Sequence, residues 1–441
     1  MSGGGGAAPR AVTTALRQAL GDDAVRDGEA VWRFSTAGAV PECVIEPTDV
    51  DQVVTAVGAA ARHQLAVLPV GNGTHLGIGW PPASPAAALS TRRLARILAH
   101  DAGDMTVRVQ AGVTIEALNA ALAAAGQWLP LDPPRAQAMT VGGMIAADRN
   151  GPLRLGYGGI RDWLIGVRAV MADGMLVRGG GQVVKNVAGY DLPRLFAGSF
   201  GTLGVIVEAT FKVRPQVAGM ALCEWTAPSL ADALARARAV LGSDVQPVLL
   251  EAVNESAAEA LGLDSGASLL IGYAGSPAHL DEQAARIAAL SDGAAARHAS
   301  ERGDALLRAL REFSQPADED ALVIRLSVLP TALGPLVAEI EAAAATARVV
   351  AEIAAHAGNG VAWCQLLGAP DEAALIGVAE AARAAARRQG GWAVFESMPA
   401  ELRGRLDPWG FDAPALAIMR RVKAALDPSG LFSPGRFVGA L

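Results

Sequence analysis

Cysteine is scarce in this sequence, and its few thiols are widely spaced. Only Cys43, Cys223 and Cys364 occur among the 441 residues, and none belongs to a Cys-x-x-Cys pair. An iron–sulfur cluster or a structural zinc ion needs several closely spaced ligands, so this chain alone is expected to hold neither. A sparse, odd set of thiols also argues against a secreted disulfide framework and fits a reducing compartment.

Charged residues and long apolar runs are also scarce. The chain is 18% charged and 51% hydrophobic, a composition that excludes a disordered scaffold. Its net charge of −7 argues against a nucleic-acid partner. No apolar run reaches the about 18 residues that a membrane-spanning helix needs, and residues 1–9 lack the apolar stretch and basic flank of a signal peptide. We therefore expect a cytoplasmic protein without a transmembrane segment.

The pattern of elements changes near Pro215. Before it, Gly- and Pro-rich loops separate short elements; after it, strands alternate with Ala-rich helices, which is typical of an antiparallel sheet with helices on one face. In the first part, helices are expected at 49–63 and 114–125 and strands at 65–70, 105–110, 163–171, 175–178 and 204–213. In the second part, helices are expected at 230–241, 278–290, 304–313, 332–345, 372–389 and 414–426, and strands at 220–225, 248–253, 268–273, 322–328, 348–353, 361–367 and 392–396.

A glycine-rich loop directly follows the expected strand at 65–70. Glycine tolerates positive φ, so successive backbone N–H groups can converge on phosphate oxygens with no Cβ in the way. A simple turn could use the same residues. The spacing matches neither a Rossmann fingerprint nor a Walker loop, which disfavours a nicotinamide-dependent dehydrogenase. The loop consists of Gly71, Asn72, Gly73, Thr74, His75, Leu76 and Gly77.

Two further glycine-rich stretches follow, at 140–156 and 183–206. In the first of them, the pair Gly142 and Gly143 opens a helix of small residues. Such a pair lets the backbone press against a flat ring or a diphosphate. Three glycine-rich stretches separated by regular elements suggest a dinucleotide threaded between two subdomains, without identifying it.

The three clusters, in this order, resemble the FAD-binding domain of the vanillyl-alcohol oxidase/PCMH superfamily. Three details narrow the resemblance: Gly-Gly-Gly-Gln-Val-Val-Lys-Asn-Val-Ala-Gly-Tyr-Asp-Leu at 179–192, Gly-Thr-Leu-Gly-Val-Ile at 201–206, and Leu-Asp-Pro-Ser-Gly-Leu-Phe-Ser-Pro-Gly-Arg at 426–436. Together they closely resemble the FAD-binding subunits of bacterial glycolate oxidases, enzymes that combine three different subunits. The resemblance covers nearly the whole chain.

This resemblance implies a fold class and a domain order. It implies an α+β chain with a two-subdomain PCMH-type FAD-binding domain at 36–215, followed at 216–405 by a cap domain with an antiparallel sheet and helices. Residues 1–35 would form a flexible lead and an N-terminal helix. Residues 406–441 would pack back on the FAD-binding domain.

The resemblance also implies where FAD binds, with its pyrophosphate on the loop 71–77 and its flavin ring near 133–148 and 204–206. Some relatives attach the flavin covalently through a histidine directly after the glycine pair. Here Thr74 intervenes before His75, so we expect noncovalent FAD. Ser433 stands where many relatives have Asn before Pro-Gly. The implied cofactor-binding residues are Gly71, Asn72, Gly73, Thr74, His75, Leu76, Gly77, Pro133, Thr140, Gly142, Gly143, Ala146, Asp148, Gly204 and Ile206.

The cap departs from the pattern of single-chain relatives that oxidise D-2-hydroxy acids. Those relatives carry a metal site built from two histidines around a Gly-Asp-Gly-Asn turn and a further Glu-His-Gly. Here only His356 remains, and Trp363 replaces the second histidine, so no metal site is expected. Arg311 and Arg325 resemble cap residues that supply positive charge to a substrate carboxylate, which a guanidinium can bind bidentately. Alternatively, Arg311 pairs with Glu312 or solvent.

Three functions are compatible with these features. The first is the FAD-binding subunit of a glycolate oxidase complex, which passes electrons from a small 2-hydroxy acid to a larger FAD-linked flavoprotein subunit and an iron–sulfur subunit, and which reaches the inner face of the membrane through these partners. In that case the larger subunit could oxidise the substrate, leaving this chain an electron-relay or assembly role. The second is a self-sufficient FAD-dependent D-2-hydroxy-acid dehydrogenase of the D-lactate type. The third is a flavin-free scaffold.

Overall fold

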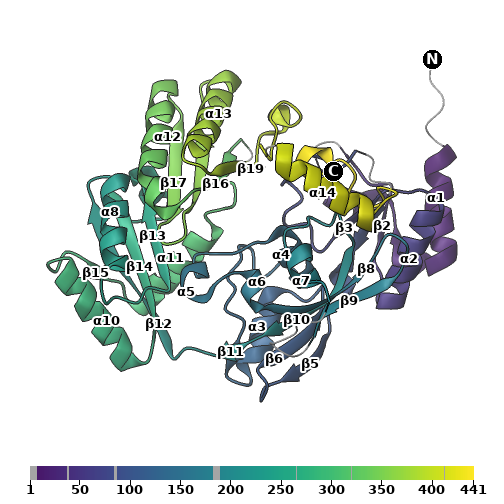
Figure 1. Cartoon of the computed structure of the whole chain (residues 1–441), viewed down its shortest axis with the longest axis horizontal. Coiled ribbons are helices and arrows are strands. Elements are labelled where there is room, and N and C mark those ends of the chain that lie inside the picture. Colours follow the sequence, from purple (N-terminus) through teal and green to yellow (C-terminus); the bar gives the residue numbers. More distant parts are fainter. Residues whose placement is uncertain are drawn as a thin grey trace. The chain divides into compact units, whose positions relative to one another are not determined.

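The computed structural model describes residues 7–36, 39–83, 87–181, 189–264, 266–318, 320–411 and 413–441. Residues 182–188, part of the third glycine-rich stretch, and residues 1–6, part of the expected flexible lead, lie outside the described residues. The chain forms two compact units (Figure 1). Unit 1 consists of Met1–Arg149, Gly159–Gln216 and Phe411–Leu441, and unit 2 of Asn150–Gly158 and Val217–Gly410. The short segment Asn150–Gly158 therefore clusters with unit 2, although it lies inside the range expected for the FAD-binding domain.

The first sheet of unit 1 is a small, mostly parallel layer with two helices. Its strand order is β1 (Val25–Arg26), β2 (Cys43–Ile45), β4 (Ala87–Ser90) and β3 (Val67–Val70). Strands β2, β4 and β3 run parallel, and β1 is antiparallel to β2. Helices α1 (Ala7–Leu20) and α2 (Val50–Arg62) contact each other, and α2 buries Val53, Ala56 and Val57 in the core beside β2 and β3. Asp49 caps α2 by accepting a hydrogen bond from Gln52 N at 2.8 Å.

The second sheet of unit 1 is antiparallel. Its strand order is β5 (Ile97–Asp101), β6 (Thr106–Gln110), β10 (Val205–Lys212), β8 (Leu164–Val170) and β9 (Leu176–Gly180), and a separate pair joins β7 (Gln127–Trp128) to β11 (Arg214–Pro215). The helices that accompany it are α3 (Ile115–Ala123), α4 (Val141–Ala147), α6 (Ile160–Trp163) and α7 (Leu192–Phe196), while α14 (Ala413–Leu426) returns to unit 1 near the C-terminus. The four-stranded and the five-stranded sheet of this unit agree with the two-subdomain prediction.

Unit 2 is built on one eight-stranded antiparallel sheet. The strand order is β15 (Ala296–Arg297), β12 (Gly219–Ala227), β14 (Ala267–Gly275), β13 (Leu249–Val253), β17 (Val350–His356), β18 (Val361–Leu367), β16 (Leu322–Ser327) and β19 (Trp392–Ser397). The expected strands of this region are thus confirmed as one sheet. Short helices α5 (Arg154–Tyr157) and α9 (Glu255–Ala260) contact β13 and β17, respectively.

The two faces of this sheet differ, because successive side chains of a strand alternate between faces. One face packs against α8 (Leu230–Leu241), α10 (Pro277–Leu290), α12 (Leu333–Ala347) and α13 (Glu372–Arg388) to form the main core, and α8, α12 and α13 lie over it in Figure 1. The expectation that all helices share this face is wrong for α11 (Ser300–Glu312). Gly303 of α11 faces Leu222, which points away from the core that holds Cys223.

The bounds of most elements agree with the sequence periodicity. Helix α8 spans the expected 230–241, and its capping residue Ser229 accepts a hydrogen bond from Asp232 N at 3.2 Å. Strands β2 and β4 were not predicted, because each is only three or four residues long and carries no alternating pattern. Among the described residues, no helix combines the length and the apolar character needed to cross a membrane.

Candidate functional site

A pocket lies in unit 1. Three chain segments form most of its wall: the end of β3 with the loop after it, helix α4, and the start of β10 with the loop before it. It is lined by Leu68, Pro69, Val70, Gly71, Asn72, Gly73, Thr74, His75, Leu76, Thr91, Thr140, Gly142, Gly143, Ala146, Ala147, Phe200, Gly201, Gly204, Val205, Ile206 and Arg436. The three glycine-rich stretches of the sequence thus meet at one cavity.

Most of the cofactor-binding residues expected from the sequence line this pocket. Of the described residues with that expected role, Gly77, Pro133 and Asp148 do not line it. Arg311 and Arg325 belong to unit 2. Sequence analysis did not select several residues of the wall, above all Phe200, Gly201 and Arg436, which come from a later loop and from the C-terminal tail.

The loop 71–76 has a backbone path that requires glycine. A Cβ on Gly71 would lie 2.0 Å from Thr140 Oγ1 and 3.0 Å from Thr140 Cβ, so a side chain has no room there. Gly73 has a φ of +79°, which a residue with a side chain rarely adopts. Asn72 Nδ2 donates to Ala138 O at 2.9 Å and Ser90 Oγ donates to Gly71 O at 2.9 Å. These contacts tie the loop to the segment that precedes α4 and to the end of β4.

Three arginines surround this loop. Arg436 Nη2 donates to His75 O at 3.2 Å and to Leu76 O at 3.0 Å. Arg135 Nη1 donates to Thr74 O at 3.3 Å, and Arg33 Nη2 lies 3.4 Å from Asn72 Oδ1. Because guanidinium groups stay charged, they give the loop a positive surrounding that suits a phosphate group. The glycines marked the loop in the sequence. Arg33 and Arg135 carried no such signal, and Arg436 ends the motif at 426–436, which does not reveal its partners.

The opposite wall suits a flat, apolar group. Helix α4 closely approaches Ala111, the residue after β6, because Gly142 has no side chain: a Cβ there would lie 2.9 Å from Ala111 Cβ. Gly204 is similarly confined, with a Cβ position 2.9 Å from Val170 O. Around these glycines the wall is formed by Ala146, Val205 and Ile206. Close backbone and small side chains leave a smooth surface for an aromatic ring.

The C-terminal tail joins the two walls of the pocket. Leu431 O accepts from Val67 N at 2.8 Å, and Ser433 N donates to Val67 O at 2.8 Å, so the tail extends the edge strand β3. Ser433 is fully buried, and its Oγ donates to Gly201 O at 3.3 Å. The serine at this position therefore binds the loop before β10.

In unit 2, a row of polar and aromatic side chains crosses the sheet face that lies opposite the main core. Buried His356 contacts the buried carboxylate of Glu251 through Nδ1 and packs edge-on against Trp363, with 4.7 Å between ring centroids. Burial raises the pKa of Glu251, and the contact with His356 partly offsets that shift. Across the ranges that the structure describes, no three His, Cys, Asp or Glu side chains gather into a group that could hold a metal ion.

The same row contains Arg325. Its Nε lies 2.5 Å from Glu396 Oε1, and its guanidinium carbon lies 4.7 Å from the centroid of the Trp392 ring. Trp363 Nε1 donates to Glu396 Oε2 at 3.3 Å, which links this ion pair to His356. The second candidate, Arg311 on α11, lies 3.3 Å from Glu312 Oε1, the pairing considered from the sequence. Gln365 Nε2 donates to Phe313 O at 2.8 Å, so the end of α11 reaches this sheet face.

Comparisons with known proteins agree with this geometry. Residues 41–180 match the FAD binding domain family, and residues 215–391 and 408–437 match the family described as FAD linked oxidases, C-terminal domain. Over 98% of its length, the chain resembles the p-cresol methylhydroxylase structure, covering 97% of that chain with a TM-score of 0.78 and 15% identity. That likeness concerns the fold.

Three curated relatives add detail. The chain is 37% identical over 177 residues to glycolate oxidase subunit GlcD of Bacillus subtilis, which covers 40% of this chain and 38% of that protein. It is 42% identical over 121 residues to glycolate oxidase subunit GlcE of Escherichia coli, covering 27% of this chain and 35% of that protein. It is 25% identical over 471 aligned positions to the mitochondrial D-lactate dehydrogenase [cytochrome] of Arabidopsis thaliana, covering 98% of this chain and 80% of that protein. The aligned stretches thus span well under half of the two glycolate oxidase subunits. The two family matches and the shared fold together show that this chain combines the FAD binding domain and the C-terminal domain of the FAD-linked oxidases, on the fold of p-cresol methylhydroxylase.

Proposed function

We propose that the chain takes part in the FAD-dependent oxidation of 2-hydroxy acids as the FAD-binding subunit of a glycolate oxidase complex. The observation that carries the first half of this proposal is the pocket of unit 1, whose glycine-lined loop and small-residue wall suit a diphosphate and a flat ring. Similarity to GlcD, GlcE and D-lactate dehydrogenase supports hydroxy-acid chemistry. We also propose residues 36–215 as the FAD-binding domain, 216–405 as the cap and 406–441 as a segment returning to the first.

The residues present fit FAD. When bound, FAD supplies an acceptor for the hydride that leaves the carbon bearing the substrate hydroxyl. The loop 71–76 and Arg436 would hold the pyrophosphate, while α4 and residues 204–206 would hold the flavin ring. We propose that attachment is noncovalent, because Thr74 separates Gly73 from His75 and the Thr74 hydroxyl lies 3.0 Å from His75 Nδ1. Heat denaturation would then release the flavin intact.

On the substrate side, Arg311 and Arg325 are proposed anchors for a carboxylate. Their surroundings distinguish them. The charge of Arg325 is already compensated by buried Glu396, which makes it a weak anchor. Arg311 contacts Glu312, whose side chain is 38% exposed, so a substrate carboxylate could replace that partner at little cost.

The proposed role as a subunit rests on the positions of the three cysteines and on the contact of His356 in unit 2. Cys43, Cys223 and Cys364 are all buried and widely separated, so an iron–sulfur relay would have to lie on another polypeptide. We propose as partners a larger FAD-linked flavoprotein subunit and an iron–sulfur subunit, with attachment to the cytoplasmic face of the membrane through them. The same proposal includes substrate oxidation in the larger subunit, with this chain serving in electron relay or assembly. The contact of His356 with Glu251 supports this, because it occupies the imidazole.

A self-sufficient D-2-hydroxy-acid dehydrogenase is the second candidate. The alignment with the Arabidopsis D-lactate dehydrogenase favours it, since it spans nearly the whole of this chain. Anaerobic mixing of the purified yellow chain with glycolate or D-lactate distinguishes the self-sufficient dehydrogenase from the subunit of a complex. Bleaching of the flavin by the chain alone supports self-sufficiency, whereas bleaching only after addition of co-purified partner subunits supports the complex. A colourless chain that takes up no FAD would favour the flavin-free scaffold and contradict both.

A further inference from the structure

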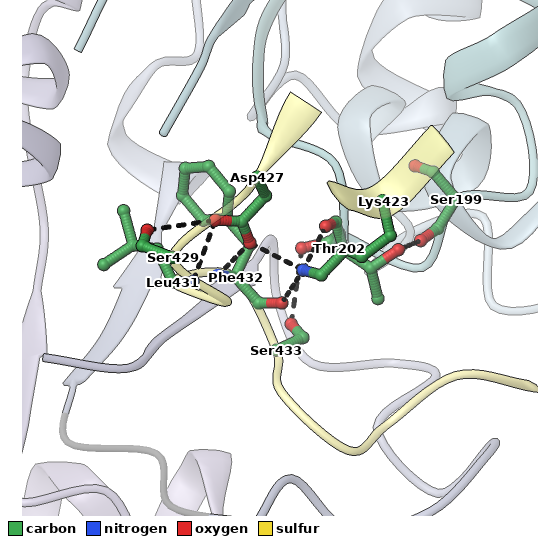
Figure 2. Close-up of polar contacts among 9 residues, drawn as sticks. Ser199, Thr202, Lys423, Asp427, Ser429, Leu431, Phe432 and Ser433 are labelled. Carbon is green, nitrogen blue, oxygen red and sulfur yellow. Dashed lines mark hydrogen bonds and ion pairs between the residues drawn. The ribbon is translucent and has the colours of Figure 1, made fainter. Parts of the chain in front are cut away.

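A buried lysine in α14 is tied to the loop that forms one wall of the pocket (Figure 2). Lys423 is 8% exposed, and its Nζ contacts three oxygens: Thr202 O at 2.7 Å, Phe432 O at 2.8 Å and Asp427 Oδ2 at 2.6 Å. An ammonium group has three N–H donors, so each can be assigned one acceptor. One charged group therefore joins α14, the pocket loop and the C-terminal tail.

Asp427 completes this junction from the other side. Its carboxylate is fully enclosed and accepts hydrogen bonds from Leu431 N at 2.9 Å and from Phe432 N at 2.8 Å, besides the ion pair with Lys423. Ser429 Oγ lies 3.4 Å from the same carboxylate. Each charge is thus neutralised by the other and by peptide groups, as a buried ion pair must be to avoid a large desolvation cost.

The loop that Lys423 holds has an unusual backbone. Phe200 and Gly201 have φ values of +50° and +68°, and a residue with a side chain adopts positive φ only at a cost of about 1 kcal/mol or more. Thr202 Oγ1 donates to Ser199 O at 2.7 Å, which closes the turn. Phe200 and Gly201 both line the pocket, as does Gly204 farther along the same loop. A strained loop persists only where contacts from outside hold it, and Lys423 supplies such a contact at Thr202.

We propose that Lys423 and Asp427 are positioning residues for the flavin, which hold the loop 199–204 and the C-terminal tail in the arrangement that shapes the pocket. The tail, in turn, binds both cofactor loops, because Ser433 contacts Gly201 and Arg436 contacts His75 and Leu76. The ion pair thereby sets the spacing between the proposed pyrophosphate loop and the proposed ring wall. This inference rests on FAD occupying the pocket as proposed above.

The test compares Lys423→Met, Asp427→Asn and the double variant with wild type in the full chain. Apoprotein is titrated with FAD by fluorescence quenching, and the visible absorption and circular dichroism bands of the bound flavin are recorded. Arg420→Met is the matched control, because Arg420 lies on the same helix and is exposed. Asp427→Asn keeps an oxygen that can accept from the tail N–H groups, so it retains the fold more readily than Lys423→Met.

We expect Lys423→Met to bind FAD about tenfold more weakly, since two buried carbonyls and a carboxylate lose a charged donor. The flavin bands should shift, because the ring then meets an altered wall. Asp427→Asn should change affinity and spectrum in the same direction, and the double variant should cost less than the sum of the two singles, because the groups are coupled. The control should match wild type.

Two results would overturn the inference. One is a wild-type chain that binds FAD while both single variants bind it with unchanged affinity and unchanged spectra. The other is a loss of thermal stability in the apoprotein of both variants, with FAD affinity and spectra unaltered, which would show a purely structural role. A wild-type chain that takes up no FAD contradicts the proposed function itself, so the two failures are distinguishable.

Discussion

The Nε atom of Arg325 lies 2.5 Å from Oε1 of Glu396, a carboxylate whose side chain is only 4% exposed. The contact joins neighbouring strands β16 and β19, and the guanidinium also covers the Trp392 ring. Because its charge is already paired with Glu396, Arg325 contributes more to the stability of the unit 2 sheet than to substrate binding.

This relationship predicts different consequences for the two candidate carboxylate anchors. Arg325→Met leaves Glu396 buried beside an apolar side chain, so we expect a loss of about 2 kcal/mol or more in the free energy of unfolding. Arg311→Met should leave stability within about 0.5 kcal/mol and raise the KM for a 2-hydroxy acid about tenfold. Urea unfolding measures the change in stability, and steady-state kinetics of the assembled enzyme measure the change in KM. The reverse assignment of the two effects would show that Arg325 is the anchor.

Arg436 is predicted to matter for FAD affinity more than Arg33. Arg436→Met removes the two hydrogen bonds to His75 O and Leu76 O together with a buried charge at the pocket, and should weaken FAD binding about tenfold. Arg33 is exposed and its hydrogen bond to the loop, at 3.4 Å, is long, so Arg33→Met should change the affinity for FAD less than about threefold. Fluorescence titration at low and high salt checks this order. Equal effects from both variants would argue against the proposed pyrophosphate site.

The buried thiols should react slowly in the native chain. Burial raises the pKa of Cys43 to about 11, and it also raises the pKa of Cys223 and of Cys364, so little thiolate forms near pH 8. Because the folded pKa of Cys43 exceeds its unfolded value, its contribution to stability is present below about pH 9 and is lost as the pH rises through 11. Alkylation at pH 8 with and without urea measures how fast the thiols react in the native and in the unfolded chain. Rapid labelling of the native chain would contradict the described burial.

The pair formed by Glu251 and His356 should be sensitive to removal of one partner. His356→Leu leaves a buried carboxylate without its imidazole, and we expect a loss of about 3 kcal/mol. Adding Glu251→Gln to that variant removes the buried charge and should restore part of the loss. Urea unfolding of the two variants tests this, and a double variant less stable than His356→Leu would contradict it.

Sequence patterns predicted the parts of the site that depend on local backbone. Gly71, Gly73 and Gly142 marked the pocket because a side chain at these positions would clash or would need a positive φ, as the Thr140 contact of Gly71 shows. Helix α8 was predictable because its apolar period, its Ser229 cap and the following Gly242 agree.

The remaining features depend on contacts between distant segments. Lys423 donates a hydrogen bond to Thr202, which lies 221 residues earlier in the sequence, and no local pattern predicts such a partner. Arg436 and Phe200 lie in stretches that the sequence marks, but their places in the pocket wall likewise depend on contacts between distant segments. The segment Asn150–Gly158 clusters with unit 2 because Gly156 N donates to Val248 O at 3.1 Å, and a Cβ on Gly156 would lie 2.6 Å from Val248 Cα. Gly156 in the sequence indicated a close approach of two backbone segments, but it did not indicate that the other segment contains Val248.

The most direct test of the account is FAD titration of Gly71→Ala against wild type. Gly377→Ala on α13 is the matched control, because a Cβ at Gly377 meets no atom within 4 Å. We predict that wild type and Gly377→Ala bind one FAD alike, while Gly71→Ala binds it at least about tenfold more weakly, because its new methyl group displaces Thr140 and the loop. Undiminished FAD binding by Gly71→Ala would contradict the claim that this loop and pocket hold the cofactor.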